Sequence, residues 1–357
     1  MKLKQFYNNK KILVTGATGF KGAWLCLWLK MLGAKVYGIG YKPNSNKRLF
    51  DQLNLSKVIN FKYVDIRNYK KTNNFIIKSK PQIIFHLAAQ PIISKSYESP
   101  RYTYEVNSIG TLNLMDIISK NKFIKSSIFV TSDKCYESNN STVGFKESDK
   151  LGGIDPYSGS KACAEIIVNT YYQSYIRNKI NIGIATARAG NVIGGGDWSK
   201  DRLVPDSIKS LSIKKTIIIR HPNFNRPWQH VLEPLYGYLL LAEKLYKEPN
   251  KFSGPWNFGT ERNTITSVEQ VIHKIISFWG EGKYKKINKK KFYEQTNLQL
   301  NISKAKKELK WKPKLSIDDC ISMTVDWYKK VLVNQKTINQ ITETQIVNYM
   351  KLNDKKN

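Results

Sequence analysis

The stretch KILVTGATGFKG, residues 11–22, decides the fold. Its first five residues form an apolar run typical of a buried strand, and AWLCLWLKMLG, residues 23–33, follows as an amphipathic helix ending at Gly33. Gly16, Gly19 and Gly22 therefore lie in a turn between strand and helix, where small residues let backbone N–H groups reach a pyrophosphate. A glycine triplet also occurs in ordinary tight turns, but this setting favours dinucleotide binding.

Further apolar runs alternate with helical patterns through the first half of the chain. These runs are KVYGIGY (35–41), PQIIFHLAA (81–89), SSIFV (126–130) and NIGIATARAG (181–190). Strands that alternate with helices and glycine-rich turns indicate right-handed βαβ units. We therefore predict an α/β protein with a Rossmann-type doubly wound parallel sheet and a smaller C-terminal α/β substrate-binding domain.

The rhythm of the sequence changes near residue 190, and this change suggests domain boundaries. We expect a dinucleotide-binding Rossmann domain over 1–188, to which later segments near 228–258 return. Residues 189–335 should form mainly the substrate-binding domain, followed by a polar peripheral tail over 336–357.

Composition narrows the class of protein. The 357 residues are 41% hydrophobic and carry a net charge of +32, but the lysines are spread along the chain without a basic-aromatic module or a Cys/His finger. We therefore expect neither nucleic acid nor membrane as a partner and treat the charge as a solvated surface bias. The N-terminus lacks a signal-peptide pattern, and four scattered cysteines fit neither a metal site nor a disulfide framework, so a cytoplasmic protein without metal is expected.

A tyrosine and a lysine stand four residues apart in DPYSGSKACAE, at Tyr157 and Lys161. On a helix this spacing places both side chains on one face, where an ammonium can stabilise a phenolate and lower its pKa. The pair follows the glycine turn by about 140 residues, after a strand that ends near Ser132. This combination is a strong signal of hydroxyl oxidation.

The residues after the second strand leave the choice of cofactor open. GIGYKP has no acidic residue to bind a ribose 2′-hydroxyl, and Lys42, Lys47 and Arg48 lie nearby. On physical grounds alone, NAD and NADP both remain possible.

Several longer motifs are similar to those of a known superfamily. The glycine pattern, HLAA, the Ser132, Tyr157 and Lys161 set, and RAGNVIGGGDW resemble the extended short-chain dehydrogenases/reductases. More narrowly, VTSDKCYE, LGGIDPYSGSK, DRLVPD and RPWQHVLEPLYGYLLLAE resemble the CDP-glucose 4,6-dehydratases. The similarity runs from about residue 10 to 330 and implies bound NAD, a CDP-glucose substrate and, by fold analogy, a homodimer that serves deoxysugar and surface-polysaccharide synthesis.

The resemblance also implies contacts for individual residues. The cofactor would meet Gly16, Gly19, Phe20, Gly22, Asp65, Ile66, Leu87, Ala88, Ala89, Asn107, Tyr157 and Lys161. The nucleotide sugar would meet Asn191, Arg202, Arg226 and His230. For His230, a neutral histidine packed in the core is as well supported as a substrate contact. His86 is expected to be structural.

The implied reaction is an internal redox dehydration. Tyr157 would take the proton of the sugar 4-hydroxyl while Ser132 holds that oxygen. Asp133 would protonate the departing 6-hydroxyl, and Lys134 would remove the C5 proton, although a lysine of ordinary pKa near about 10.4 is a weak base at neutral pH. Lys134 could alternatively position the sugar or orient Asp133.

Three other functions compete with this interpretation. A nucleotide-sugar 4-epimerase, or a dehydratase for another nucleotide, would share the Ser132, Tyr157 and Lys161 chemistry. Epimerisation needs no elimination acid and base, so the Asp133–Lys134 pair favours dehydration. A non-catalytic dinucleotide or nucleic-acid binder would not need the intact catalytic set.

Overall fold

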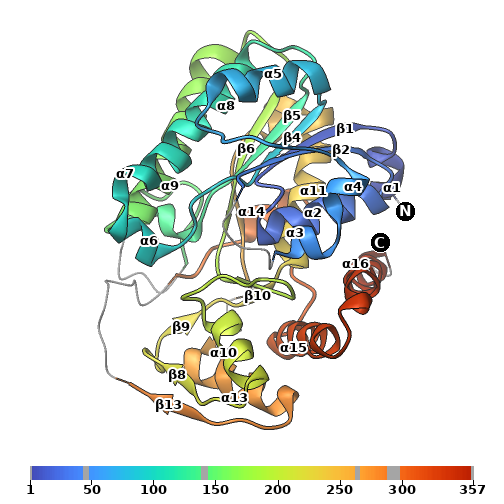
Figure 1. Ribbon diagram of the computed structural model, residues 1–357. Coiled ribbons are helices and arrows are strands. Elements are labelled where there is room, and N and C mark those ends of the chain that lie inside the picture. Colours follow the sequence, from blue (N-terminus) through green and yellow to red (C-terminus); the bar gives the residue numbers. More distant parts are fainter. Residues whose placement is uncertain (1, 43–47, 138–143, 262–265, 288–297, 355–357) are drawn as a thin grey trace.

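The computed structural model describes residues 2–42, 48–137, 144–261, 266–287 and 298–354. Its centre is a seven-stranded parallel sheet in the order β11-β6-β5-β4-β1-β2-β3 (Figure 1). The strands are β1 (Lys11–Thr15), β2 (Lys35–Gly40), β3 (Asn60–Tyr63), β4 (Ile83–His86), β5 (Ser126–Val130), β6 (Gly183–Ala189) and β11 (Gly254–Phe258). All five apolar runs predicted as strands lie in this sheet, which confirms the Rossmann-type α/β fold.

Helices cover both faces of the sheet. One face packs against α5 (Tyr69–Ser79), α8 (Gly110–Ser119) and α9 (Pro156–Tyr171), and the other against α1 (Lys2–Tyr7), α2 (Phe20–Met31) and α11 (Leu232–Lys247). The pleat of the strands explains this division, because neighbouring side chains point to opposite faces. Ile84 of β4 joins the α5, α8 and α9 core, whereas Ile83 and Phe85 join the other core.

Short helices and turns join the longer elements of the chain. They are α3 (Leu49–Gln52), α4 (Leu55–Val58), α6 (Ile93–Glu98), α7 (Pro100–Tyr104), α12 (Pro249–Phe252) and α14 (Ser303–Glu308), with π-helical turns at Glu105–Ile109 and Tyr172–Ile176 and 3₁₀ turns at Asp133–Cys135 and Gln335–Thr337. The chain returns to the sheet through α11 and the edge strand β11, between two stretches that form the second part of the molecule.

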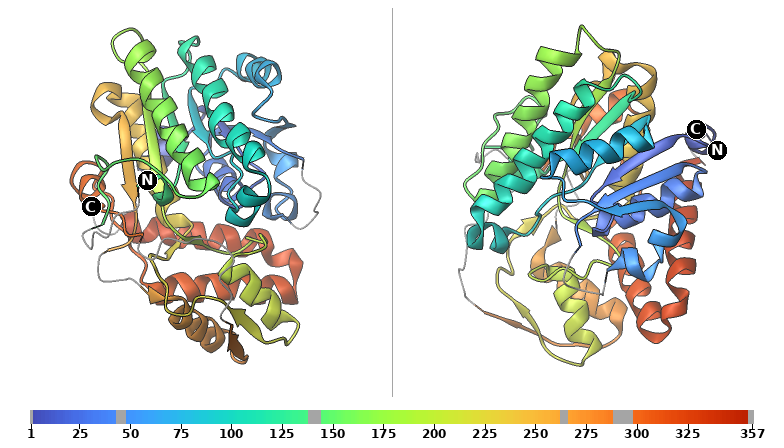
Figure 2. Two further views of the ribbon diagram at one scale, coloured as in Figure 1. Left: turned by 90° about the vertical axis from the view of Figure 1, so that its left-hand side faces the viewer. Right: turned by 45° about the horizontal axis from the view of Figure 1, so that its top comes forward.

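The second part of the molecule lies beyond the carboxyl ends of the sheet strands (Figures 1 and 2). It contains α10 (Leu203–Ser212), α13 (Val268–Trp279) and α15 (Ile317–Val333). Three two-stranded sheets accompany these helices. In them β7 (Val192–Ile193) pairs with β10 (Gln229–His230), β8 (Ile217–Ile219) with β13 (Tyr284–Lys286), and β9 (Asn225–Arg226) with β12 (Thr266–Ser267). Its buried residues belong to the same core cluster as α2 and α11, so the two parts share one continuous interior.

Helix α2 joins the glycine turn to the rest of the molecule. Trp24 Nε1 donates to the Gly195 carbonyl at 2.9 Å, and Trp28 Nε1 donates to Met350 Sδ at 3.3 Å. Gly195 has no space for a side chain, since a Cβ there would lie 2.0 Å from the Trp327 ring. The helix that follows the glycines therefore contacts both the loop before α10 and the end of the chain.

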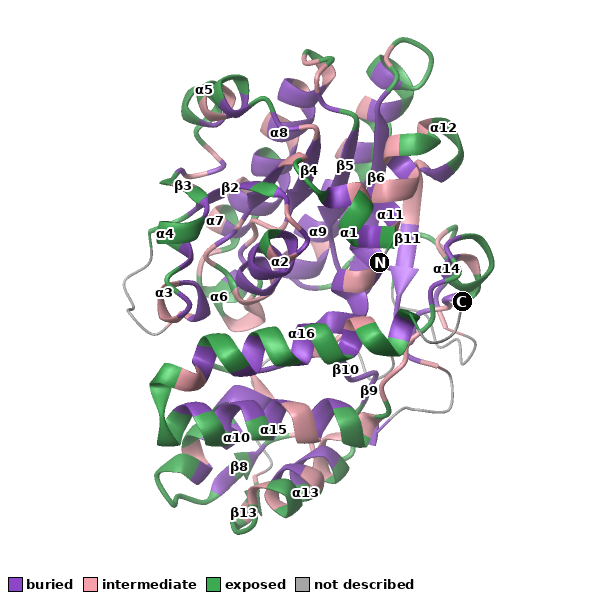
Figure 3. Cartoon of the chain, turned by 90° about the vertical axis from the view of Figure 1, so that its right-hand side faces the viewer, coloured by how far each residue is buried: buried purple, intermediate pink, exposed green. Residues whose placement is uncertain are grey.

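The C-terminal segment, predicted as a polar peripheral tail, is helical. It forms α16 (Ile338–Asp354), a surface helix with one face buried against α2 and α15 (Figure 3). Tyr349 Oη donates to Glu233 Oε2 at 2.6 Å, and Thr342 Oγ1 accepts from Trp327 Nε1 at 2.9 Å. The segment is polar in composition because its outer face dominates, while Ile338, Ile341, Ile346 and Tyr349 are buried.

Replacing Ile346 by alanine should test this docking. Ile346 is fully buried, so Ile346→Ala should lower the free energy of unfolding by about 2–5 kcal/mol through lost burial and an unfilled cavity. The neighbouring Val347→Ala is the control, because Val347 is 38% exposed and its change should stay within about 0.5 kcal/mol. Urea unfolding measures both, and equal effects would contradict the docking of α16.

Candidate active site

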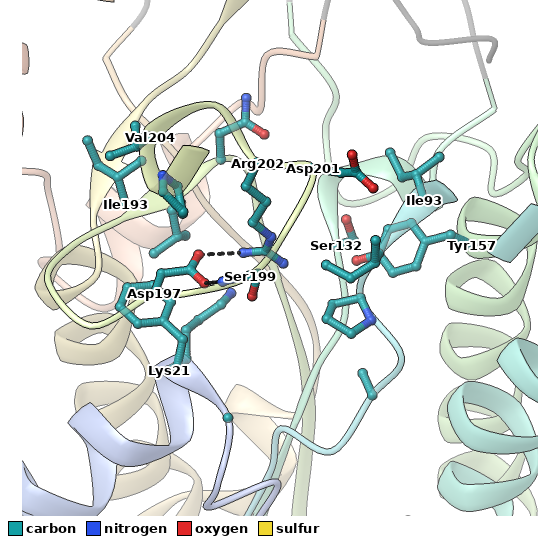
Figure 4. Close-up of a pocket in the computed structure, with 18 of the residues that line it drawn as sticks. Lys21, Ile93, Ser132, Tyr157, Ile193, Asp197, Ser199, Asp201, Arg202 and Val204 are labelled. Carbon is teal, nitrogen blue, oxygen red and sulfur yellow. Dashed lines mark hydrogen bonds and ion pairs between the residues drawn. The ribbon is translucent and has the colours of Figure 1, made fainter. Parts of the chain in front are cut away.

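A cavity of about 770 Å³ lies between the sheet and the second part of the molecule. Its walls come from the glycine turn, the carboxyl ends of β2, β4 and β5, the start of α9, and the segments from β7 to β9. Ligands of open parallel sheets bind at this edge, where the loops after the strands converge. Figure 4 shows Ser132 and Tyr157 on one side of this cavity, and Lys21, Asp197 and Arg202 on the other.

The glycine turn brings backbone atoms to the cavity wall. Gly16 has a φ of +71°, and a Cβ on Gly22 would stand 2.1 Å from the Gly16 carbonyl oxygen. Gly16, Gly19, Phe20 and Gly22 all line the cavity, and α2 begins at Phe20 with its N-terminus at the turn. The turn therefore has the space and the N–H groups that a pyrophosphate requires.

The residues predicted for the two ends of a dinucleotide also line the cavity. These are Asp65, Ile66, Leu87, Ala88 and Ala89. The Asp65 carboxylate is paired with the Arg67 guanidinium at 2.7 Å. The small side chains after β4 leave room for a flat ring beside the sheet.

The cations predicted near the second strand differ in their surroundings. Arg48 pairs with Asp51 at 2.7 Å, and its NH2 group also donates to Tyr63 Oη. Tyr41 lines the cavity at the end of β2, Lys42 is exposed, and Lys47 lies outside the described residues. The paired state of Arg48 gives no support for a cation reserved for a 2′-phosphate.

Ser132, Tyr157 and Lys161 come together at one wall of the cavity. Tyr157 and Lys161 are buried one turn apart on α9, and Lys161 Nζ donates to the Val130 carbonyl at 3.2 Å. Burial raises the pKa of Tyr157 to about 12, against the lowering effect of a hydrogen bond with Ser132. Burial lowers the pKa of Lys161 to about 8, while Glu165 acts in the opposite direction. A phenolate at Tyr157 thus needs more positive charge than these groups provide alone.

Asp133 and Lys134 follow Ser132 in a 3₁₀ turn, and both line the same cavity. Ser132 Oγ donates to Asp133 Oδ1 at 3.0 Å, whereas the buried Oδ2 has no hydrogen-bond partner among the described residues. Burial raises the pKa of Asp133, opposed by Lys134, Ser132 and Arg226. A carboxyl with a raised pKa and an unused oxygen suits a group that donates a proton.

Three of the four residues predicted to bind substrate line the cavity, namely Asn191, Arg202 and Arg226. Arg202 NH1 pairs with Asp197 Oδ2 at 3.1 Å, and the Arg226 guanidinium lies 5.1 Å from the centre of the Phe224 ring. Two guanidinium groups in one cavity suit the binding of a diphosphate.

His230 lies in the core and does not line the cavity. It is fully buried beside the Trp24 ring, with 5.9 Å between ring centres, and burial lowers its pKa to about 3. The predicted substrate contact is therefore wrong for His230, and the packed neutral alternative describes its position. Its sequence neighbours mislead, because Trp228 does line the cavity two residues earlier.

Asn107 also lies behind the cavity wall. Its side chain accepts from the Gln90 amide at 2.8 Å and donates to the Gln90 carbonyl and to Ser160 Oγ. These bonds tie the segment after β4 to α9, which is the structural part of the role predicted for Asn107, and its cofactor contact stays a prediction. His86 is similarly internal, between Thr15 and Thr111.

Lys21 and Asp197 line the cavity, although the sequence did not single them out. Burial lowers the pKa of Lys21 to about 8, with Arg202 and Lys161 adding to the lowering. Lys21 could have been noticed in the sequence, because a charged residue stands between Phe20 and Gly22 where a small or apolar residue would suffice for the turn. Asp197 had no such signal, because its pairing with Arg202 depends on the loop that joins them.

Two further features are absent from the part of the chain that the structure describes. No three His, Cys, Asp or Glu side chains gather as a metal site requires. Nor does any helix in these ranges have the length and apolar character to cross a bilayer.

Substituting Lys161 should separate stability from activity. Because burial disfavours the Lys161 ammonium, Lys161→Met should raise the free energy of unfolding at pH 7, by up to about 3 kcal/mol, while activity is lost. The gain should be complete well below a pH of about 8, shrink as the pH rises from 8 to 10.5, and vanish above 10.5, where the lysine is neutral in both states. Urea unfolding across this range is the measurement. The exposed Lys78→Met is the control, and an equal gain there would contradict the effect of burial.

The chain is similar to known proteins over most of its length. The family model described as GDP-mannose 4,6 dehydratase matches residues 13–324. A CDP-glucose 4,6-dehydratase of Salmonella typhimurium is 40% identical over 331 residues, which cover 91% of this chain and 92% of that protein. A UDP-glucose 4-epimerase of Pisum sativum is 25% identical over 346 residues, which cover 90% of this chain and 96% of that protein.

Solved structures agree on the fold. A UDP-glucose 4-epimerase of Thermotoga maritima superposes with a TM-score of 0.78 at 24% identity, covering 90% of this chain and 99% of that one. A dTDP-glucose 4,6-dehydratase of Bacillus anthracis in complex with NAD gives 0.75 at 24% identity, covering 93% and 99%. With a family model matched over most of its length and a relative at 40% identity, this chain belongs to the GDP-mannose 4,6 dehydratase family.

Proposed function

We propose that the protein is an NAD-dependent CDP-glucose 4,6-dehydratase. It would convert CDP-glucose into CDP-4-dehydro-6-deoxyglucose and water, without net change in the cofactor. The observation that carries this proposal is the Asp133–Lys134 pair in the same cavity as Ser132, Tyr157 and Lys161. Oxidation at a sugar hydroxyl needs only the last three residues, so an additional acid and base point to elimination. The 40% identical relative with this activity supports the substrate.

The cavity fits the proposed cofactor. A side chain at Gly16 or Gly22 would collide with backbone atoms or fill the cradle, so the glycines leave the approach to α2 open. When bound there, NAD would accept a hydride from C4, return it to C6, and favour the Tyr157 phenolate by the positive charge of its nicotinamide ring. Gly16, Gly19 and Gly22 would hold its pyrophosphate, with Asp65 and Ile66 toward the adenine.

The residues of the chain divide the proton transfers between them. Tyr157 removes the proton of the 4-hydroxyl, and Ser132, within reach of Tyr157, donates a hydrogen bond to the same oxygen. The resulting ketone acidifies the C5 proton, which Lys134 removes. Asp133, whose pKa is raised by burial, protonates the 6-hydroxyl as it leaves as water.

The substrate would lie with its sugar at Ser132 and its diphosphate at Arg202 and Arg226. Asp197 holds Arg202 at 3.1 Å, which fixes the direction of that guanidinium. Planar guanidinium groups suit phosphate oxygens because two parallel N–H groups can bind at once. Asn191, beside these arginines in the cavity wall, would complete the set.

We also propose a cytoplasmic homodimer that supplies a deoxysugar for an O-antigen or capsule. All four cysteines are free, as expected of a protein in a reducing compartment. The dimer rests on analogy with the superfamily, and sedimentation velocity would test it.

Product analysis tests the proposed function. Purified protein should convert CDP-glucose in the presence of NAD to a product lighter by one water, with no reduced nicotinamide left over. UDP-glucose and dTDP-glucose serve as matched substrates. Turnover of one of these without turnover of CDP-glucose would refute the substrate. A product of unchanged mass would indicate a 4-epimerase and refute the elimination.

Replacing Lys134 separates oxidation from elimination. Lys134→Ala should still allow a burst of reduced-nicotinamide absorbance, because Ser132, Tyr157 and Lys161 remain, but exchange of the C5 proton should fall by about 100-fold or more. Tyr157→Phe is the control and should lose both signals. Deuterium incorporation from heavy water, followed by mass spectrometry, measures the exchange. Near-normal exchange in Lys134→Ala would show that Lys134 is not the base.

A further inference from the structure

A buried ion pair lies directly behind the cavity wall. Glu165 of α9 and Arg188 of β6 are each 3% exposed and stand 2.8 Å apart. The Glu165 carboxylate accepts four hydrogen bonds, from the hydroxyls of Thr131 and Thr186 and from two nitrogens of Arg188. A buried pair is tolerated only when its polar atoms are satisfied in this way.

Both ends of the turn at residues 132–135 are attached to this pair. At the first end, Thr131 precedes Ser132 and donates its hydroxyl hydrogen to Glu165 Oε1. At the other end, Arg188 NH1 donates to Tyr136 Oη at 2.7 Å, and the guanidinium lies over the Tyr136 ring. The turn carries Ser132, Asp133 and Lys134 between these two anchors.

The turn itself is short and internally bonded. Ser132 Oγ accepts from the Lys134 amide at 3.2 Å, and the Cys135 amide donates to the Ser132 carbonyl at 3.3 Å. Because so few residues separate the anchors, a shift at either end displaces all three polar side chains.

Glu165 also belongs to the helix that presents Tyr157 and Lys161. It follows Lys161 by four residues and Tyr157 by eight, so the three side chains share one side of α9. Arg188 extends the connection to β11, since Tyr136 Oη donates to Asn257 Oδ1 at 2.8 Å in the neighbouring strand. One ion pair thus connects the helix of the oxidation residues to the turn of the elimination residues.

We propose that Glu165 and Arg188 are positioning residues that hold the 132–135 turn in register with Tyr157 and Lys161. This inference rests on the proposed dehydratase function, in which all five polar side chains must act on one sugar. The pair touches no substrate and works through Thr131 and Tyr136. Displacement of reacting groups by about 1 Å can cost about 100-fold in rate, so a loosened turn should slow the elimination.

Substitution of Glu165 or Arg188 would leave a buried charge without its partner and could prevent folding, so the anchors are the better targets. Thr131→Val and Thr186→Val form a matched pair. Each removes one hydroxyl donor from the same buried carboxylate with little change of shape, but only Thr131 is joined to the turn. Similar losses of thermal stability are expected from both.

The expected difference is in catalysis. Thr131→Val should lower kcat for dehydration of CDP-glucose by about tenfold or more with KM within about twofold, whereas Thr186→Val should keep kcat within about twofold. Thr131→Ser, which keeps the hydroxyl, should restore the rate. Equal kcat values for the two valine variants, measured where both are folded, would overturn the proposal.

Amide hydrogen exchange supplies a readout that does not depend on activity. Thr131→Val should speed exchange in the segment 132–136, and Thr186→Val should leave that segment as in the parent protein. Unchanged exchange in Thr131→Val would overturn the positioning role even if the enzyme acts on another sugar. Failure of the parent protein to convert CDP-glucose would instead refute the proposed function, and the exchange result would stand by itself.

Discussion

The close approach of Gly22 to the Gly16 carbonyl is the constraint on which the rest of the structure depends. A Cβ at Gly22 would stand 2.1 Å from that oxygen, so α2 can follow β1 this closely only with glycine at this position. The helix then carries Trp24 to the Gly195 carbonyl and Trp28 to Met350. The turn that opens a space for a cofactor also determines where the second part of the molecule and α16 are anchored.

The polar side chains of the site come from two segments, the turn after β5 and the helix α9. The sheet alone does not fix the position of one segment relative to the other. The strand β5 ends in a turn with a hydroxyl, a carboxyl and an amine, whereas α9 brings a phenol and a second amine. Burial shifts the pKa of Asp133, Tyr157 and Lys161 away from the values in water. Buried polar contacts between the segments then fix distances that hydrophobic packing would leave loose.

Local patterns predicted much of the fold and the site. The runs at 11–15 and 126–130 became strands without shifted ends, and the spacing of Tyr157 and Lys161 was sufficient to place them on one helix face. Prediction failed where long-range packing decides the environment. His230 stands in a motif beside cavity residues, yet its ring turns into the core. The partners of Glu165 are 21 to 34 residues distant, so no local spacing reveals them.

The cations of the cavity have a consequence for the empty protein. Lys21, Arg202 and Lys161 lie close enough that Arg202 and Lys161 disfavour the charge on Lys21, and Asp133 and Asp197 offset this only in part. A ligand with a diphosphate brings the missing counter-charge into the space between them. Loading and folding are therefore thermodynamically linked, because each anion that enters relieves repulsion already built into the native state.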